Sequence, residues 1–264
     1  PYKRIVFDEA HGIESAATSF FSESFTRFKI NKLINQMYNK RKNSQSGHLC
    51  TLALLSSNEE KASLAYEITN KIKNDIINLE ITAEDLLKND YTKRLCSNTA
   101  VEFGPLLVCI SELSQSLGNF ADVVRVVMEG LAEDDKDIPA YWESKIILRR
   151  IDNYVLLLKN FLSWDEKLDN VYWIQLKKLP FDFSKKTQDT QFVILNETPL
   201  DISYLMNTGV YEPMKTIVCT SATLKTGHDF KYWMNRCGVN YVEKQRLLIE
   251  QFDSPFPYEK NMLF

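Results

Sequence analysis

The chain has 264 residues, of which 44% are apolar and 25% charged, and its formal net charge at pH 7 is -3. This length and composition predict a globular protein of one large or two small domains, and the net charge excludes a surface that is basic throughout. The apolar runs are far shorter than the ~18 residues of a membrane helix and no secretory leader is evident, so we expect a cytoplasmic protein without membrane contact.

The five cysteines and three histidines show no metal-binding pattern. No two cysteines form a Cys-x-x-Cys pair, and the histidines are scattered. We therefore expect reduced, mostly buried thiols and no metal cluster within this chain.

The first predicted element is the apolar strand Arg4–Phe7, which runs directly into Asp8-Glu9-Ala10-His11. An apolar strand that ends in two adjacent carboxylates suits a site for Mg and a nucleotide. One acid holds the metal and the next orients the attacking water.

A basic segment follows between residues 27 and 46. It contains six cations, no acidic residue and two interleaved aromatic residues, Phe28 and Tyr38. The cations are Arg27, Lys29, Lys32, Lys40, Arg41 and Lys42. The segment is compatible with a phosphate track for nucleic acid and equally with a solvated helix face that runs into a polar loop.

The middle of the chain predicts a long helical hairpin. Residues 58–89 have a weak helical pattern, and residues 49–55 suit either a strand or the start of a helix. From Pro105, expected at the first helical position, apolar residues recur at alternating steps of four and three as far as residue 131. These residues are Leu106, Ile110, Leu113, Leu117, Phe120, Val124, Val127 and Leu131.

A second seam follows a polar break at residues 134–139. Its members are Ile147, Ile151, Tyr154, Leu158 and Phe161. Two matching seams predict an antiparallel pair of helices, whose first arm is roughly 40 Å long at 1.5 Å per residue.

The last third of the chain predicts short mixed elements. Residues 171–176 and 192–195, on either side of polar residues 185–189, favour two strands of a small antiparallel unit. A short helix is expected after residues 199–203, with Asp201 or Ser203 as its cap and Gly209 at its end. The strand Thr216–Cys219 follows, and then a helix over residues 227–238 that ends at Gly238.

The strands Arg4–Phe7 and Thr216–Cys219 are expected to lie in one parallel sheet. Their separation is about seven times that of an ordinary strand-helix-strand unit of ~30 residues, which indicates an inserted domain. We therefore predict a mainly α fold with a minor β component. Residues 1–20 and 197–251 form one lobe, residues 21–196 the helical insertion, and residues 252–264 the start of a linker.

Together these motifs resemble the bacterial DinG helicases and their XPD-type relatives in helicase superfamily 2. The match rests on four segments. They are Asp8-Glu9-Ala10-His11 with Gly12-Ile13-Glu14, Pro199-Leu200-Asp201-Ile202-Ser203, Cys219-Thr220-Ser221-Ala222-Thr223-Leu224, and Phe252-Asp253-Ser254-Pro255-Phe256. Other DEAH helicases, which act on RNA, keep the first and third motifs close together. The resemblance implies an Arch domain between these motifs, which helps to enclose single-stranded DNA, and a RecA-like motor lobe around them.

The resemblance also implies roles for single residues. Asp8 would hold Mg, Glu9 would activate the water that attacks the γ-phosphate of ATP, and His11 would link the nucleotide site to the neighbouring motif. Ser221-Ala222-Thr223 would couple hydrolysis to movement on DNA. The alternative for Ser221 and Thr223 is ordinary capping at a turn.

A phosphate-binding loop needs Gly-Lys followed by Ser or Thr, and none of the eight glycines precedes a lysine. We therefore expect a helicase fragment that is inactive by itself. In this family the second motor lobe lies downstream, and any iron-sulfur cluster lies upstream of the DEAH strand. The alternative is a non-enzymatic helical module that docks a partner protein.

Overall fold

The computed structural model describes residues 2–42, 44–88, 90–179 and 191–252. It is mainly α with a minor β component, as predicted. The chain divides into two compact units, which are described separately: unit 1 comprises residues 1–20 and 201–264, and unit 2 residues 21–200. The predicted insertion begins at the same residue as unit 2 but ends at residue 196 instead of 200. The predicted linker, after residue 252, lies outside the described residues.

Unit 1 is built on two strands. They are β1 (Arg4–Phe7) and β8 (Thr216–Cys219). Its helical segments are η1 (Ala10–Gly12), α1 (Ile13–Phe21), α7 (Ser203–Met206), the π-helical turn η3 (Asn207–Tyr211), α8 (Lys231–Cys237), η4 (Val239–Tyr241) and η5 (Lys244–Arg246).

The two strands of unit 1 pair in parallel, with Arg4 opposite Thr216 and Phe7 opposite Cys219. This confirms the prediction that both lie in one sheet. Side chains alternate between half-buried and exposed along both strands, so one face of the pair is covered and the other faces solvent.

Unit 2 is mostly helical and carries a small sheet. Its helices are α2 (Arg27–Met37), α3 (His48–Leu55), α4 (Glu59–Leu87), α5 (Ala100–Glu129), the 3-10 turn η2 (Glu133–Asp137) and α6 (Pro139–Leu162). Its strands are β2 (Glu23–Phe25), β3 (Asn39–Arg41), β4 (Ser44–Ser46), β5 (Thr92–Leu95), β6 (Asn170–Lys178) and β7 (Gln191–Pro199).

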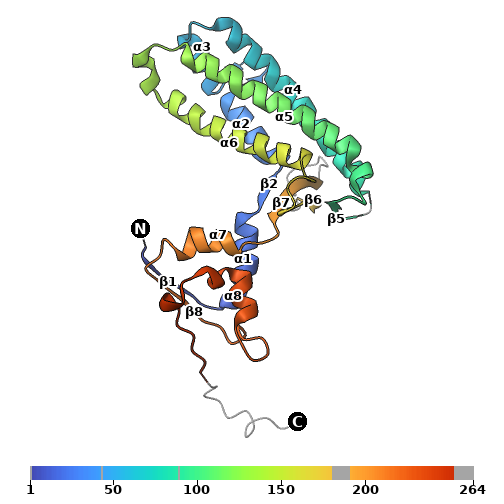
Figure 1. The fold of residues 1–264 in the computed structure, drawn as a ribbon. Helices are drawn as coiled ribbons and strands as arrows, with labels where there is room; N and C mark the ends of the chain where they lie inside the picture. Colours follow the sequence, from blue (N-terminus) through green and yellow to red (C-terminus); the bar gives the residue numbers. More distant parts are fainter. Residues whose placement is uncertain (1, 43, 89, 180–190, 253–264) are drawn as a thin grey trace. The chain divides into compact units, whose positions relative to one another are not determined.

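The predicted hairpin is present as α5 and α6, and α4 packs against the other side of α5 (Figure 1). All eight residues of the predicted seam are buried; seven lie on α5, which confirms the helix and its inner face, and Leu131 follows just after the helix ends. The seam on α4 includes Ala62, Ala65 and Ala83, all buried. Small residues allow close approach of two helices but give a weak hydrophobic period, which explains the weak sequence signal of α4.

The sheet of unit 2 is antiparallel, in the order β2-β7-β6-β5. Strands β6 and β7 confirm the predicted antiparallel pair and extend it, with Asn170 opposite Pro199 and Lys178 opposite Gln191. The predicted polar segment 185–189 lies outside the described residues. Because β7 continues to Pro199, the end of the predicted insertion falls inside a strand.

Three predicted helix ends are wrong. Pro105 is not the first helical residue, since α5 begins at Ala100 and thereby buries Phe103 completely. Gly209 does not end α7, because the helical path continues through η3 and buries Tyr211. The last helix begins at Lys231 and not at residue 227, whereas its end at Gly238 is confirmed by a left-handed φ of 80°.

Candidate functional site

The candidate site of unit 1 lies where β1 and β8 end. The ladder continues past both strands, since the Thr220 amide donates to the Phe7 carbonyl and the Ala10 amide to the Thr220 carbonyl, both at 2.9 Å. Parallel strands deliver their carboxyl ends to the same sheet edge. The two sequence motifs therefore form adjacent loops within one unit.

Asp8 is held by the loop that follows β8. The Thr220 hydroxyl donates to Asp8 Oδ1 at 3.0 Å, although the two residues are 212 positions apart, and the Glu9 amide donates to the same oxygen at 3.0 Å. Within the described residues no hydrogen bond reaches Oδ2 of this exposed carboxylate. Asp8 therefore has one fixed oxygen and one that is available to a ligand.

Glu9, His11 and Ser221 form a hydrogen-bonded triangle. The Ser221 hydroxyl donates to Glu9 Oε2 at 3.3 Å, and His11 Nδ1 lies 2.9 Å from Ser221 Oγ and 3.1 Å from Glu9 Oε2. With the proton on Nδ1, His11 donates into this pair. Glu9 adopts a left-handed backbone, with φ 50° and ψ 46°, which turns the chain sharply after β1.

The other two members of the predicted coupling motif do not join this triangle. Ala222 and Thr223 are exposed. Within the described residues the Thr223 amide donates to Ser221 Oγ at 3.4 Å, and the Thr223 side chain forms no hydrogen bond. Ser221 thus bridges the loops and also caps its own turn. The structure unites Asp8, Glu9, His11 and Ser221 and leaves the Thr223 side chain outside.

Helix α8 supports the loop after β1. Trp233 Nε1 donates to the carbonyl of Ala10 at 3.0 Å, and Ala10 itself is fully buried. The Arg236 guanidinium forms an ion pair with Glu14. Trp233 and Thr220 are site residues that the sequence analysis missed.

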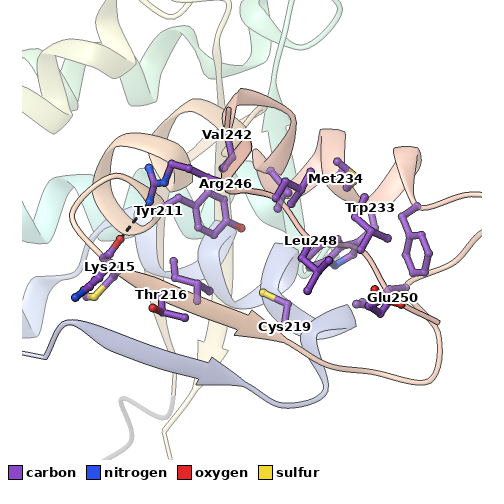
Figure 2. A pocket seen from close by; sticks show the side chains of 17 residues that line it. Tyr211, Lys215, Thr216, Cys219, Trp233, Met234, Val242, Arg246, Leu248 and Glu250 are labelled. Atoms are coloured by element: carbon purple, nitrogen blue, oxygen red, sulfur yellow. Dashed lines mark hydrogen bonds between the residues drawn. The ribbon is translucent and has the colours of Figure 1, made fainter. Parts of the chain in front are cut away.

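A cavity of about 470 Å³ lies beside β8, on the covered side of the sheet (Figure 2). Most of the residues that line it are apolar, among them Cys219, Trp233 and Leu248, and Lys215, Arg246 and Glu250 add charged groups. Burial raises the pKa of the Cys219 thiol to about 11, so this sulfur is protonated at neutral pH and behaves as an apolar side chain. Asp8, Glu9 and His11 are absent from the lining, and the cavity is therefore distinct from the polar cluster.

The basic segment of unit 2 has two parts with different environments. Arg27 is mostly buried, donates to the Gln191 carbonyl at 3.0 Å and lies 3.8 Å from Glu80 Oε2. Lys29 Nζ donates to Ser24 Oγ at 2.7 Å. Both cations thus have partners within unit 2, and their role as nucleic-acid contacts stays a prediction.

The remaining predicted contacts of this segment are exposed: Lys32 on α2, Lys40 and Arg41 on β3, and Lys42 in the following turn. The interleaved aromatic residues are occupied within unit 2. Phe28 packs edge-on against Phe192, with ring centroids 5.0 Å apart, and buried Tyr38 stacks on Tyr66. This segment therefore offers exposed positive charge, with Tyr38 buried and Phe28 still 45% exposed beside it.

In the described part of the chain no group of three or more His, Cys, Asp or Glu side chains forms a metal cage, and no helix combines the length and apolarity needed to cross a membrane. No protein-family model matches the chain, and a search of curated proteins found no match.

Proposed function

We propose that this chain is part of an ATP-dependent DNA helicase of the DinG/XPD type that acts in DNA repair or replication in the cytoplasm. In this proposal unit 1 belongs to a RecA-like motor lobe, and unit 2 is an Arch-like domain that helps to enclose single-stranded DNA. One observation carries it: two motifs more than 200 residues apart meet at one end of a parallel strand pair, where Asp8, Glu9, His11 and Ser221 form one cluster.

The chemistry of Asp8 fits Mg. This ion prefers oxygen ligands, keeps several waters and is commonly bound by one or two carboxylates together with substrate phosphates, so an all-protein cage is unnecessary. Asp8 offers an exposed oxygen, Oδ2, while Thr220 fixes the other. The ion, when bound with ATP, neutralises charge that develops on the phosphate oxygens.

The hydrogen bonds of Glu9 support a role in accepting a proton from water. Its Oε2 is occupied by Ser221, and no described residue forms a hydrogen bond with Oε1. In our proposal Oε1 orients and deprotonates the attacking water. Because the same carboxylate accepts a hydrogen bond from Ser221 in the loop after β8, a change at Glu9 during hydrolysis would alter a contact of that loop directly.

The proposal places the phosphate-binding loop in another part of the protein, because the 264 residues contain no Gly-Lys pair. The decisive experiment uses the product of the complete gene. We expect an encoded Gly-Lys-Ser/Thr loop and DNA-stimulated ATP hydrolysis whose kcat falls at least ~100-fold in Glu9→Gln. The matched control Glu243→Gln, an exposed glutamate of the same unit, should leave kcat unchanged.

Two results would oppose this proposal. A complete gene without such a loop would favour the non-enzymatic helical module, and full activity of Glu9→Gln would remove the assigned water-activating residue. The isolated chain should not hydrolyse ATP. Turnover by this chain that is lost in Glu9→Gln would show that its phosphate site is complete without that loop.

A further inference from the structure

The sharp turn that carries Glu9 depends on support from other segments of unit 1. Glu9 has φ 50° and ψ 46°, and among the described residues other than glycine only Glu9 and Lys88 have a positive φ. A left-handed backbone is unfavourable for a residue with a side chain, and it persists only where the surrounding structure fixes it. The contacts that hold this turn therefore also set the direction of the Glu9 carboxylate.

Ala10, the next residue, is held through both of its backbone polar groups. Its amide donates to the Thr220 carbonyl at 2.9 Å, and its carbonyl accepts from Trp233 Nε1 at 3.0 Å. The first bond ties the turn to the loop after β8, and the second ties it to α8. Ala10 is completely buried, so bulk water does not compete for these bonds. Together they fix the backbone on both sides of Ala10, between Glu9 and His11.

Helix α8 is anchored independently of that contact. The carbonyl of its last residue, Cys237, accepts a hydrogen bond from the buried Tyr211 hydroxyl at 2.8 Å. The following residue, Gly238, lies so close to Ser203 that an added Cβ would be 2.0 Å from the Ser203 carbonyl oxygen. Trp233 therefore projects from a helix whose other end is fixed, and a side chain on a rigid element can hold its partner precisely.

Packing alone does not hold the indole ring of Trp233. The ring lines the cavity of Figure 2, so part of its surroundings is empty. A second contact of α8, the ion pair of Arg236 with Glu14, joins side chains that are 47% and 32% exposed, and pairs in such positions contribute little. The hydrogen bond to the Ala10 carbonyl is therefore the specific link between α8 and the turn.

We propose that Trp233 is a positioning residue for Glu9 that acts through the Ala10 carbonyl, an inference that rests on the proposed function. Trp233 holds Ala10, Ala10 holds the left-handed turn, and the turn directs the Glu9 carboxylate at the attacking water. Even a small displacement of such a group slows the chemical step. Nucleotide binding should be insensitive to this bond, because Asp8, the residue assigned to Mg, has its own partner in Thr220.

The kinetic test uses the complete gene product and a double-mutant cycle. Trp233→Phe keeps an aromatic ring and removes the N–H donor, and we expect kcat to fall about tenfold while KM for ATP stays within about twofold. In a Glu9→Gln background the same change should have almost no further effect, because its effect passes through Glu9. A merely structural role would lower kcat by the same factor in both backgrounds. Tyr232→Phe, an exposed neighbour on α8, is the matched control and should leave kcat unchanged.

Hydrogen exchange measured by NMR on the 264-residue chain tests the contact itself without ATP. Trp233→Phe should speed exchange of the Ala10 amide about tenfold or more. The Lys215 amide, which bonds the Lys3 carbonyl at the far end of the strand pair, should change by less than about twofold. Circular dichroism checks that each variant is folded.

The possible results separate this inference from the proposed function. If Glu9→Gln lowers kcat as expected but Trp233→Phe does not, only the role of Trp233 is refuted. Full activity of Glu9→Gln would remove the proposed function and this inference together. Equal loss of kcat from Trp233→Phe in both backgrounds, or equal acceleration of the Ala10 and Lys215 amides, would reduce Trp233 to a residue that stabilises unit 1 as a whole and would overturn the proposal.

Discussion

Glu197 is a buried carboxylate of unit 2 that holds three elements together. Only 7% of this residue is exposed, and it accepts hydrogen bonds from Asn160 on α6, from Asn170 at the start of β6 and from Tyr172 within β6. The distances are 2.9 and 3.0 Å, 2.7 Å and 3.1 Å, respectively. Three side-chain donors therefore converge on one acceptor.

Glu197→Ala removes this acceptor and leaves all three donors without it. Tyr172, only 2% exposed, cannot turn to water, and an unsatisfied buried hydroxyl costs ~1–3 kcal/mol. Asn160 and Asn170 are half-buried, so water replaces part of their lost hydrogen bonding. Each of the two therefore costs only about 0.5–1 kcal/mol of stability. We expect a loss of about 3 kcal/mol in the free energy of unfolding of unit 2. Glu197→Gln, which keeps one acceptor oxygen, should lose about half as much.

Urea unfolding followed by far-UV circular dichroism measures this loss, because most of the helix is in unit 2. The control is Glu67→Ala on the exposed side of α4, for which we expect a change within ~0.5 kcal/mol. If Glu197→Ala also stays within ~0.5 kcal/mol of the wild type, the three bonds do not stabilise unit 2 and this reasoning is refuted.

Three further predictions concern single residues. Gly238→Ala should destabilise unit 1 by roughly 2 kcal/mol or more in a urea titration, because φ is 80° and an added Cβ would lie 2.0 Å from the Ser203 carbonyl oxygen. Burial raises the pKa of Tyr172 to about 12 from its ordinary value of 10.0, so its contribution to stability is present below pH 10 and is lost as pH rises towards 12; Tyr172→Phe should flatten this alkaline decline. Thr220→Val should lower kcat of the complete gene product about tenfold and raise the Mg concentration for half-maximal rate, whereas Thr220→Ser should retain both; an unchanged Mg dependence would exclude a positioning role towards Asp8.

The strongly periodic parts of the fold were predictable, and the polar or short parts were not. The α5 seam consists of large aliphatic and aromatic residues, so its period is clear. Strand β5 reads Thr-Lys-Arg-Leu, and only Leu95 is buried, because it is an edge strand of the sheet. Strands β3 and β4 are polar throughout, so they lack the alternation of apolar and polar residues that predicts a strand.

The residues of the candidate site likewise fall into those that the sequence predicts and those that it does not. Asp8, Glu9 and Ser221 follow apolar strands that can be recognised in the sequence. Thr220 and Trp233 act through contacts made only when distant segments meet, so no local pattern marks them. The one available signal for Thr220 was its place directly after a parallel strand, where side chains meet those of the neighbouring loop.

The pairing of β1 with β8 joins segments about 200 residues apart, and unit 2 lowers the entropy cost of that pairing. Its strands β2 and β7, which pair with Glu23 opposite Glu197, bring together the points where the chain enters and leaves unit 2. Once unit 2 is folded, the effective loop between β1 and β8 shrinks to about 35 residues. Since each doubling of loop length costs ~0.6 kcal/mol, this saves about 1.5 kcal/mol.

The stability of unit 1 should therefore depend on whether unit 2 is folded, and because such coupling is reciprocal, unit 2 gains the same ~1.5 kcal/mol from unit 1. In hydrogen exchange measured by mass spectrometry, Glu197→Ala should speed exchange in residues 216–220, where the Thr220 amide bonds the Phe7 carbonyl. Gly238→Ala, the matched perturbation of unit 1, should speed hydrogen exchange in residues 216–220, and it should change exchange in residues 193–199 by no more than the ~1.5 kcal/mol of coupling allows. Unchanged exchange of residues 216–220 in Glu197→Ala would show that the two strand pairs form independently, and that unit 2 is not what brings the ends of β1 and β8 together.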